Sequence, residues 1–331
     1  MTAFGREFMP KMALSQFDGS GWSNSEVVPC DSVILHAGAH VLHYSSTVFE
    51  GLKAFKHSDG CVKLFRPQQN IERLANSSAL LQLPKIDTQL VEEMVLSIVR
   101  QYANDTPAPP GSMYIRPTHI GTDAAIGAAA SGSTESLLYI LLSPVGEYFS
   151  GGDQGLRILV EEDYARCAPH MGMVKSGSNY ASALGPTLKA KQEWDAAQIL
   201  FCPGGDVQET GASNFLLIDG NTLITKALDS SFLHGVTRDS ILTLARDRNM
   251  DVQERTLSTD ELFERIQNPA CEAALSGTAA VLAPVSTLIR NGKEYQIGSG
   301  QVGKTTVSLR EELNAIQWGK QPDKHNWLVS V

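Results

Sequence analysis

Apolar residues recur at helical spacing in PQQNIERLANSSALLQLP, residues 67–84, and a proline stands near each end of this stretch. One face of the predicted helix would carry Ile71, Leu74, Ser78 and Leu81. Further on, SLLYILLSPVG from Ser136 is a short apolar run that is typical of a strand buried on both faces. The first half of the chain therefore predicts a mixture of helices and strands.

The second half reads first as strands. LRILVEED and AAQILFCPG are strand-like, and NFLLIDGNTLIT predicts a hairpin that closes at Asp219–Gly220. Helices are predicted at TRDSILTLARD, with Thr237 as the N-cap, and at STDELFERI. In the latter, Ser258 and Glu261 have the spacing of a capping box.

Segments rich in glycine, proline and small polar residues separate these elements. NDTPAPPGS and GAAASGSTES predict loops, and SPVGEYFSGGDQG, which ends at Gly155, predicts a linker between domains. We therefore expect an α+β protein with a smaller domain at 1–147, an interdomain loop at 148–157 and a larger domain at 158–331. The cleft between two such domains is the natural place for a ligand.

Composition narrows the class of protein. The 331 residues are 42% hydrophobic and 19% charged, which suits a folded core. A net charge of −9 argues against binding to nucleic acid, and no apolar stretch approaches the roughly 20 residues that cross a bilayer. The N-terminus lacks the apolar core of a signal peptide. Five scattered cysteines without a CxxC pair fit reduced thiols, so we expect a cytoplasmic globular protein.

The stretch VKSGSNYASAL places Lys175 among small and polar residues. Most lysines are solvated, but a lysine that performs covalent chemistry needs partners that adjust and use its amine. The chain offers Glu209 before the hairpin, Gly-Val-Thr at the start of a helix, a Ser-Gly-Thr run ending at Thr278, and Arg73 on the first helix. Each alone is weak, since a Gly-Val-Thr is usually a helix cap and an arginine is usually a surface group. One amine, one carboxylate, one arginine and two anion cradles are together what pyridoxal phosphate requires.

In this order the segments resemble the fold-type IV, pyridoxal-phosphate-dependent aminotransferases, and within them the branched-chain amino acid aminotransferases. The resemblance covers nearly the whole chain, from LHYSSTVFEGLKAF through LFRPQQNIERL, MYIRPTHIGT, LLSPVGEYFSGG, VKSGSNYASAL, QETGASNF, GVTRDSIL and SGTAAVLAPV to LNAIQWG. FEGLKAF, YIRP and K-x-G-x-N-Y are together highly specific. The resemblance implies a two-domain fold, like that of D-amino acid aminotransferase, with an N-terminal α/β sandwich and a C-terminal pseudo-barrel. It also implies a homodimer that transfers amino groups between leucine, isoleucine or valine and 2-oxoglutarate.

The resemblance further implies roles around the cofactor. Lys175 looks like the lysine that binds pyridoxal 5'-phosphate covalently and moves the substrate proton as general base and acid. Glu209 resembles the carboxylate that keeps the pyridine nitrogen protonated, and Tyr180 resembles the tyrosine that bonds the phenolic oxygen. The implied phosphate cradle consists of Arg73, Val236, Thr237 and Thr278.

Substrate residues are implied in the same way. The backbone N–H groups of Thr278 and Ala279, with the Tyr44 hydroxyl, match the site for the substrate α-carboxylate. Arg116 matches the arginine that meets the distal carboxylate of glutamate, although a strand-end salt bridge is its ordinary alternative. The aromatic pocket for a branched side chain is implied to contain Tyr44, Phe49, Tyr114, Tyr148 and Tyr180. Without the resemblance, such aromatics would be read as core residues.

The chain departs from the family pattern at a few positions. His170 and Met171 precede the lysine where a glycine-rich stretch is common, Ala212 stands where some relatives have threonine, and His234 stands where proline is common. None of these positions belongs to the implied catalytic set. They leave the range of substrates, and the preference among leucine, isoleucine and valine, open.

Other classes of protein remain as alternatives. His36, His40 and His43 could suggest a metal, but AGAHVL favours a strand or loop and no carboxylate follows at ligand spacing. A hydrolase with Lys175 as base and Ser176 or Ser178 as nucleophile would lack a GxSxG turn. A D-amino acid aminotransferase, an aminodeoxychorismate lyase or a vitamin-B6 carrier would share part of the pattern. We expect no metal.

Overall fold

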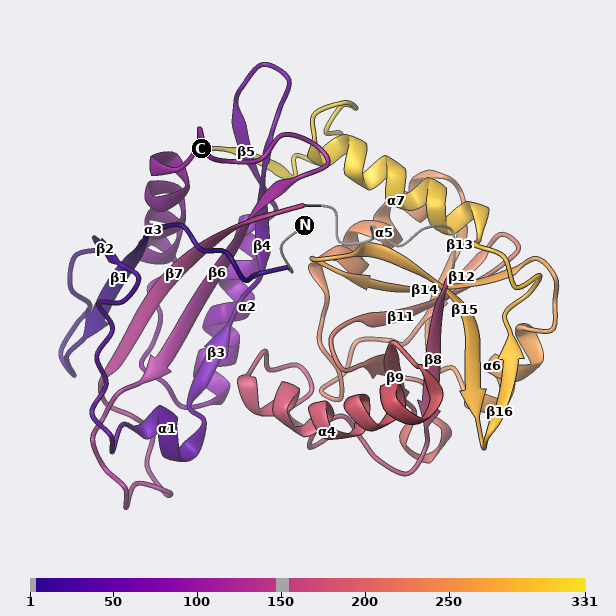
Figure 1. The fold of residues 1–331 in the computed structure, drawn as a ribbon, viewed down its shortest axis with the longest axis horizontal. Coiled ribbons are helices and arrows are strands. Elements are labelled where there is room, and N and C mark those ends of the chain that lie inside the picture. Colours follow the sequence, from indigo (N-terminus) through magenta and orange to yellow (C-terminus); the bar gives the residue numbers. More distant parts are fainter. Residues whose placement is uncertain (1–3, 147–154) are drawn as a thin grey trace. The chain divides into compact units, whose positions relative to one another are not determined.

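The computed structural model describes residues 4–146 and 155–331, and these fall into two compact units (Figure 1). Tyr148 and most of the predicted interdomain loop at 148–157 lie outside the described residues. Besides the N-terminal part of the chain, the first unit contains Val174–Ser178 and Ile316–Val331. The second unit contains, among the described residues, 155–173 and Asn179–Ala315. The two units are therefore of similar length.

The C-terminal residues thus differ from the prediction, which assigned all of 158–331 to the second domain. The reason is a strand pairing: Leu328–Ser330 runs antiparallel to Val62–Phe65, and Leu328 lies opposite Phe65. The Arg66 guanidinium also lies 5.3 Å from the centre of the Trp327 ring. A three-residue strand of this kind carries no periodic signal that would have revealed its partner.

An antiparallel sheet forms the body of the first unit (Figure 1). Its order is β17-β5-β4-β6-β7-β1-β2, and β3 pairs with β6. Its strands are β1 (Lys11–Phe17), β2 (Glu26–Pro29), β3 (Thr47–Phe49), β4 (Leu52–Lys56), β5 (Val62–Phe65), β6 (Ser112–Gly121), β7 (Ser136–Val145) and β17 (Leu328–Ser330). The predicted apolar strand is confirmed as β7.

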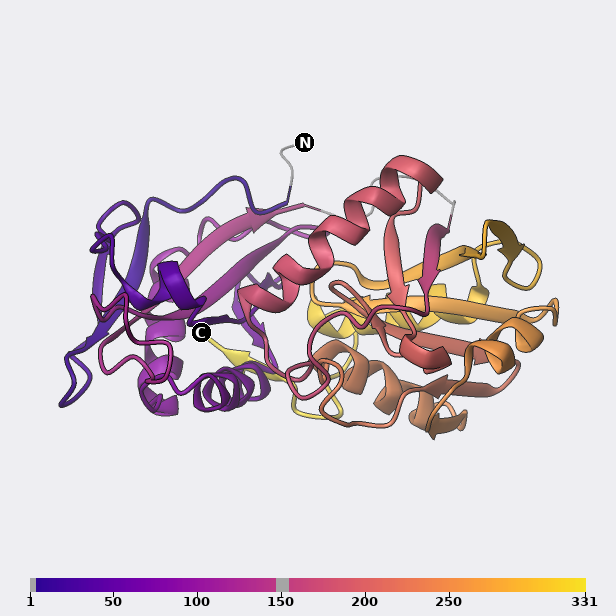
Figure 2. The same ribbon diagram turned by 90° about the horizontal axis from the view of Figure 1, so that it is seen from below.

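Two helices, α2 (Pro67–Leu80) and α3 (Thr88–Gln101), pack on one face of this sheet (Figure 2). The predicted helix is confirmed as α2, with Pro67 in its first turn. Side chains alternate along β6, and His119 faces the helices because its Nδ1 lies 2.9 Å from Ser78 Oγ on α2. Tyr114 and Arg116 therefore point to the opposite face of the sheet. The short helix α1 (His40–Tyr44) precedes β3.

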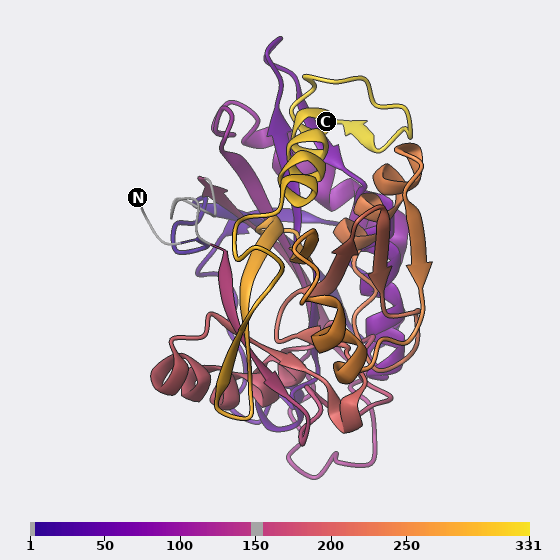
Figure 3. The same cartoon turned by 90° about the vertical axis from the view of Figure 1, so that its right-hand side faces the viewer.

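A closed barrel forms the body of the second unit (Figure 3). Six strands close it, because β10 pairs with both β9 and β11, and β8, β15 and β14 complete the ring. The barrel confirms the predicted C-terminal fold. The strands of this unit are β8 (Leu156–Glu161), β9 (Gln198–Phe201), β10 (Glu209–Thr210), β11 (Asn214–Asp219), β12 (Thr222–Thr225), β13 (Asp251–Glu254), β14 (Cys271–Gly277), β15 (Val281–Arg290) and β16 (Lys293–Gln296).

The predicted hairpin is confirmed as β11 and β12, and its loop falls one residue later than expected. Asp219 lies opposite Thr222, so the two loop residues are Gly220 and Asn221. The remaining helices are α4 (Gly177–Trp194), the 3₁₀ turn η1 (Pro203–Gly205), α5 (Val236–Asp247), α6 (Thr259–Arg265) and α7 (Lys304–Gln317). In the described parts of the chain, no helix is long and apolar enough to cross a membrane.

Helix starts correct one prediction and refine another. The N-cap of α5 is Gly235, so the prediction that Thr237 caps this helix is wrong; Thr237 lies inside the first turn. Ser258 does cap α6, because its hydroxyl accepts from the Glu261 N–H at 3.1 Å. The carboxylate of Glu261 accepts instead from Arg255 and Arg265, so the Ser258 half of the capping box is the half that forms.

Candidate active site

Main-chain contacts hold Lys175 in the first unit. Its N–H donates to Ser77 Oγ on α2 at 3.1 Å, and its carbonyl accepts from the Phe49 N–H on β3 at 3.0 Å. The next residue, Ser176, forms a β-bridge with Val48. The Lys175 amine lies 5.2 Å from the centre of the Phe49 ring, within the range of a cation–π contact. The half-buried lysine is therefore not a solvated loop residue.

One face of α2 builds the surroundings of this lysine. Asn70, Arg73 and Ser77 lie three and four residues apart, so they share a face of the helix. Arg73 Nε and Nη2 donate to the two oxygens of Glu50 at 2.6 and 2.8 Å, and Asn70 Nδ2 donates to Glu50 at 2.8 Å. The structure thus places Arg73, the predicted phosphate residue, in a bidentate pair with a buried carboxylate.

Sequence reasoning missed Glu50. Its relative exposure is 0%, and burial alone would raise the pKa of its carboxyl. The charges of Arg73 and Lys175 and the hydrogen bonds from Arg73 and Asn70 outweigh burial, so the pKa of Glu50 lies below its usual value. The signal in the sequence is an acidic residue inside the apolar run VFEGLKAF, because a carboxylate buried in a strand needs a partner.

Three of the predicted substrate residues meet on the helix-free face of the first unit's sheet. The Arg116 guanidinium lies 4.5 Å from the centre of the Phe49 ring and 5.3 Å from that of Tyr114. Arg116 Nη2 donates to the Tyr114 hydroxyl at 2.8 Å. A Cβ at Gly51 would lie 2.1 Å from that hydroxyl, so any larger residue there would displace the Tyr114 side chain. The buried Arg116 Nε has no hydrogen-bond partner among the described residues.

Tyr44 does not join these three residues. It ends α1, and its hydroxyl donates to the Ile126 carbonyl at 2.5 Å. The neighbouring histidines are held by hydrogen bonds: His40 contacts Ser46 Oγ and the Ser131 carbonyl, and His43 contacts the Ala37 carbonyl. Across the described ranges, no group of three or more His, Cys, Asp or Glu side chains could hold a metal ion.

The side chain of Lys53 also lies on the helix-free face, because Lys53 is opposite Tyr114 in the strand register. It is 8% exposed, and burial lowers its pKa to about 8. The lowered pKa means that the charged amine destabilises the folded state. Each unit by which the folded pKa lies below the unfolded pKa corresponds to about 1.4 kcal/mol of lost stability. Sequence reasoning assigned Lys53 no role.

Lys53→Met is expected to stabilise the protein by about 2–3 kcal/mol at pH 7, because a buried methionine removes the cost of the charged amine. Since the folded pKa is the lower one, the unfolded state binds more protons between pH 8 and 10.5, and wild-type stability rises with pH over that window. Urea unfolding at pH 7 and pH 10 should therefore show a gain that shrinks at high pH. The exposed Lys189→Met is the control, and an equal gain at both pH values would contradict the explanation.

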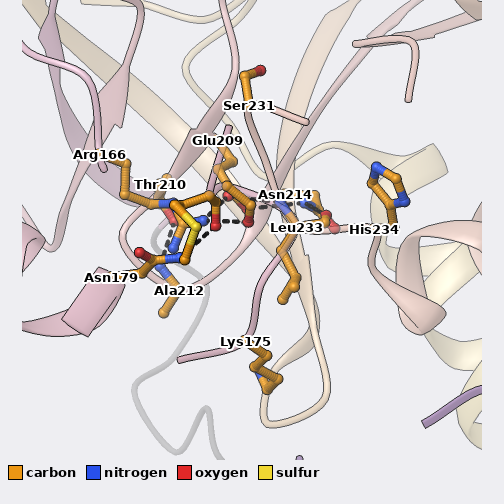
Figure 4. A network of polar contacts seen from close by, with 12 residues as sticks. Arg166, Lys175, Asn179, Glu209, Thr210, Ala212, Asn214, Ser231, Leu233 and His234 are labelled. Atoms are coloured by element: carbon orange, nitrogen blue, oxygen red, sulfur yellow. Dashed lines mark hydrogen bonds and ion pairs between the residues drawn. The ribbon is translucent and has the colours of Figure 1, made fainter. Parts of the chain in front are cut away.

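In the second unit, three donors orient the Glu209 carboxylate (Figure 4). Arg166 Nη2 lies 2.8 Å from Oε1, the Leu233 N–H donates to Oε1 at 2.9 Å, and Asn214 Nδ2 donates to Oε2 at 3.1 Å. Both Glu209 and Arg166 are buried. The carboxylate thus has a fixed orientation and a compensating cation inside the barrel unit.

Strand register aligns Glu209 with the predicted anion cradles of the same unit. Glu209 on β10 lies opposite Asn214 on β11, which lies opposite Ser276 on β14. Ser276 Oγ is buried and has no partner within the described ranges, and the turn after β14 contains the half-buried Thr278 and Ala279.

The start of α5 approaches the same row of residues. Asn214 Nδ2 donates to the Leu233 carbonyl at 2.8 Å, and a Cβ at Gly235 would lie 2.1 Å from Asn214 Oδ1. Over the described chain, no side chain caps the N-terminus of α5, where Val236 and Thr237 form the first turn. Tyr180 is half-buried on α4.

Arg166 is the second residue that sequence reasoning missed. Besides Glu209, its Nη2 reaches the Gly172 carbonyl at 2.8 Å, which ties the segment before Lys175 to the barrel strand β10. The sequence shows only an arginine in the polar stretch EEDYARCAPH, so the only signal is the need of a buried Glu209 for a cation.

The departures from the family pattern border these contacts, and Figure 4 shows Ala212 and His234 beside the Glu209 network. His170 and Ala212 are exposed, and the Met171 carbonyl accepts from Asn179 Nδ2 at 2.7 Å. His234 Nε2 lies 2.8 Å from the Asp229 carbonyl. The hydrolase alternative is weakened, because Ser176 is 0% exposed and its Oγ lies 2.8 Å from Ser178 Oγ.

Known proteins resemble this chain along its whole length. The model of the family "Amino-transferase class IV" matches residues 47–288. The "Probable branched-chain-amino-acid aminotransferase" of Streptomyces coelicolor is 36% identical over 99% of this chain and 92% of its own length. The "Branched-chain-amino-acid transaminase 1" of Bacillus subtilis is 37% identical over 99% of this chain and 94% of its own.

Solved structures agree with these relatives. The crystal structure of the Escherichia coli branched-chain amino acid aminotransferase matches with a TM-score of 0.78 and 26% identity, over 96% of this chain and 98% of that chain. The chain therefore belongs to the class IV aminotransferases.

Proposed function

We propose that the protein is a pyridoxal-phosphate-dependent branched-chain amino acid aminotransferase. It would transfer the amino group reversibly between leucine, isoleucine or valine and 2-oxoglutarate. Membership of the class supports the cofactor and the type of reaction, and the names of the relatives support the substrates. The observation that carries the proposal is Glu209, a buried carboxylate oriented by three donors, which suits a protonated ring nitrogen.

Three further features of the second unit suit the cofactor. The uncapped start of α5 offers backbone N–H groups and the positive end of a helix, which favour a phosphate. Gly235 allows the chain to approach closely at this point, and the buried Ser276 hydroxyl, which has no partner among the described residues, offers one more polar contact. Val236, Thr237 and Thr278 would hold the phosphate here, and Tyr180 would contact the phenolic oxygen.

In the first unit, Arg73 would add a cation to the phosphate site, and Lys175 would provide the reactive amine. When bound, the cofactor supplies an aldehyde that bonds to an amine and a ring that accepts electrons from the substrate carbon. Lys175 Nζ would take the proton from the substrate Cα as a general base. It would then donate the proton to the cofactor carbon C4′ as a general acid. Glu209 would hold the proton on the ring nitrogen.

The helix-free face of the first unit suggests how the site accepts two kinds of side chain. Phe49 and Tyr114 offer apolar ring surface to a branched aliphatic side chain, whereas Arg116 offers a cation to the distal carboxylate of glutamate. Thr278, Ala279 and Tyr44 would receive the α-carboxylate, and Tyr148 would contribute to the aromatic wall.

Arg116→Met is expected to raise the KM for glutamate and 2-oxoglutarate about 10- to 100-fold. A charge-assisted hydrogen bond is worth about 1.5–3 kcal/mol, and an aliphatic substrate never forms it. Leucine and its keto acid should stay within a few-fold of wild type. Two half-reactions followed by cofactor absorbance measure the effect, and equal slowing of both would assign Arg116 to the structure of the sheet instead.

A panel of amino donors and keto acids tests the function itself. Leucine, isoleucine and valine should each change the cofactor absorbance of the purified protein, and 2-oxoglutarate should restore it. D-alanine and aminodeoxychorismate are the controls for the other reactions of this fold, and a response to these alone would contradict the proposal. We further propose a cytoplasmic homodimer; the five cysteines, all free thiols, support a reducing compartment, and light scattering would measure the mass.

A further inference from the structure

The Glu50 carboxylate faces two cations of the first unit. Arg73 binds both of its oxygens, at 2.6 and 2.8 Å, and the charge of Lys175 is close enough to lower the pKa of Glu50. Asn70 Nδ2 and the Gly51 N–H donate to the same carboxylate at 2.8 and 3.1 Å. Four donor contacts therefore fix the carboxylate in a place where its exposure is 0%.

We propose that Glu50 is the resident counter-ion of the cofactor site, which holds the Arg73 guanidinium in place and balances Lys175 when no phosphate is bound. The inference rests on the proposed function, since it assigns Arg73 and Lys175 to cofactor binding. Glu50 is then a positioning residue, because it acts through these two cations.

Electrostatics gives the reason for such a counter-ion. Two like charges held together in a protein interior repel each other, and a buried guanidinium without a partner is strongly unfavourable. The cofactor phosphate would give Arg73 an anionic partner, and Lys175 would be bonded to the cofactor aldehyde, but the cofactor-free protein needs an internal anion for both cations. With Glu50 in place, Arg73 is oriented before the cofactor arrives. Without Glu50, the fold should depend on an external anion.

The test is the thermal unfolding of cofactor-free Glu50→Gln, with and without inorganic phosphate. We expect the midpoint to fall by about 6–10 °C without phosphate, as for the loss of one partner from a buried ion pair. Phosphate should raise the midpoint of the variant several times more than that of wild type, whereas sodium chloride at equal ionic strength should not. Saturation with pyridoxal phosphate should bring variant and wild type closer together than they are without cofactor.

The second unit offers a control pair with the same geometry but greater exposure. Arg290 Nε and Nη2 donate to the two oxygens of Glu162 at 2.8 Å each, the same bidentate geometry as in the Arg73–Glu50 pair. Glu162→Gln should lower the midpoint equally with and without phosphate. Glu50→Asp keeps the charge, so it should restore part of the stability and reduce the effect of phosphate. If Glu50→Gln does not fold in the absence of anions, it should fold when phosphate, but not sodium chloride, is added, and failure to fold under both conditions would overturn the inference.

Two results separate this inference from the proposed function. A Glu50 variant whose loss of stability is the same with and without phosphate would overturn the inference and make Glu50 a purely structural residue. A wild-type protein that binds no pyridoxal phosphate, judged by absorbance, would instead overturn the proposed function.

Discussion

Lys175→Ala should lower amino-group transfer by about 10⁴-fold or more, because both the covalent attachment of the cofactor and the proton-transferring amine are lost. The variant should nevertheless fold. The contacts that hold this residue use its own main chain, which donates to Ser77 Oγ and accepts from the Phe49 N–H, and alanine preserves both.

The measurement is the leucine half-reaction in a single turnover, with circular dichroism as the check on folding. Lys189→Ala is the control, since the Lys189 side chain is 73% exposed on α4 and should leave turnover unchanged. A folded Lys175→Ala that turns over at a rate comparable to wild type would show that another amine performs the chemistry.

Glu209→Gln should retain the cofactor but lose about 10²-fold or more in turnover. A neutral amide cannot hold a proton on the ring nitrogen as a carboxylate can. Its NH₂ group would also face a donor, because Arg166, Asn214 and the Leu233 N–H already surround the carboxylate. The variant should therefore be less stable as well, and rates have to be compared well below its unfolding midpoint.

A matched carboxylate separates these two effects. Glu272 on β14 also accepts from three donors, the N–H groups of Thr305 and Thr306 and the Thr306 hydroxyl. Glu272→Gln should lose stability and keep its turnover. If stopped-flow rates of Glu209→Gln matched those of wild type, another acid would have to face the ring nitrogen.

Local patterns in the sequence predicted the elements well where each element carries its own signal. The helical spacing and terminal prolines of α2 and the short apolar run of β7 are examples. The closure of the barrel depends on β10, which has only two residues, Glu209 and Thr210. No period can be read from two residues, so the resemblance to a family, rather than the pattern itself, predicted the barrel.

The same limit applies to the site. Glu50 and Arg166 were missed because their partners are distant in the sequence. Arg73 follows Glu50 by 23 residues. Arg166 lies in a loop before α4, whereas its partner Glu209 lies on β10, beyond that helix. Thr237 was misread as a cap because a threonine before a helical pattern is the usual N-cap, whereas here the glycine two residues earlier fills that position next to Asn214.

Borohydride reduction of the cofactor-loaded protein, followed by mass spectrometry of its peptides, tests directly whether Lys175 is the lysine that binds the cofactor. Reduction fixes the cofactor to whichever lysine carries it. The mass of the reduced cofactor should appear on the peptide that contains Lys175. The sharpest competitor is Lys53, whose pKa of about 8 leaves part of its amine neutral and reactive near that pH. The cofactor's mass on Lys53, or on any lysine other than Lys175, would contradict the assignment of Lys175.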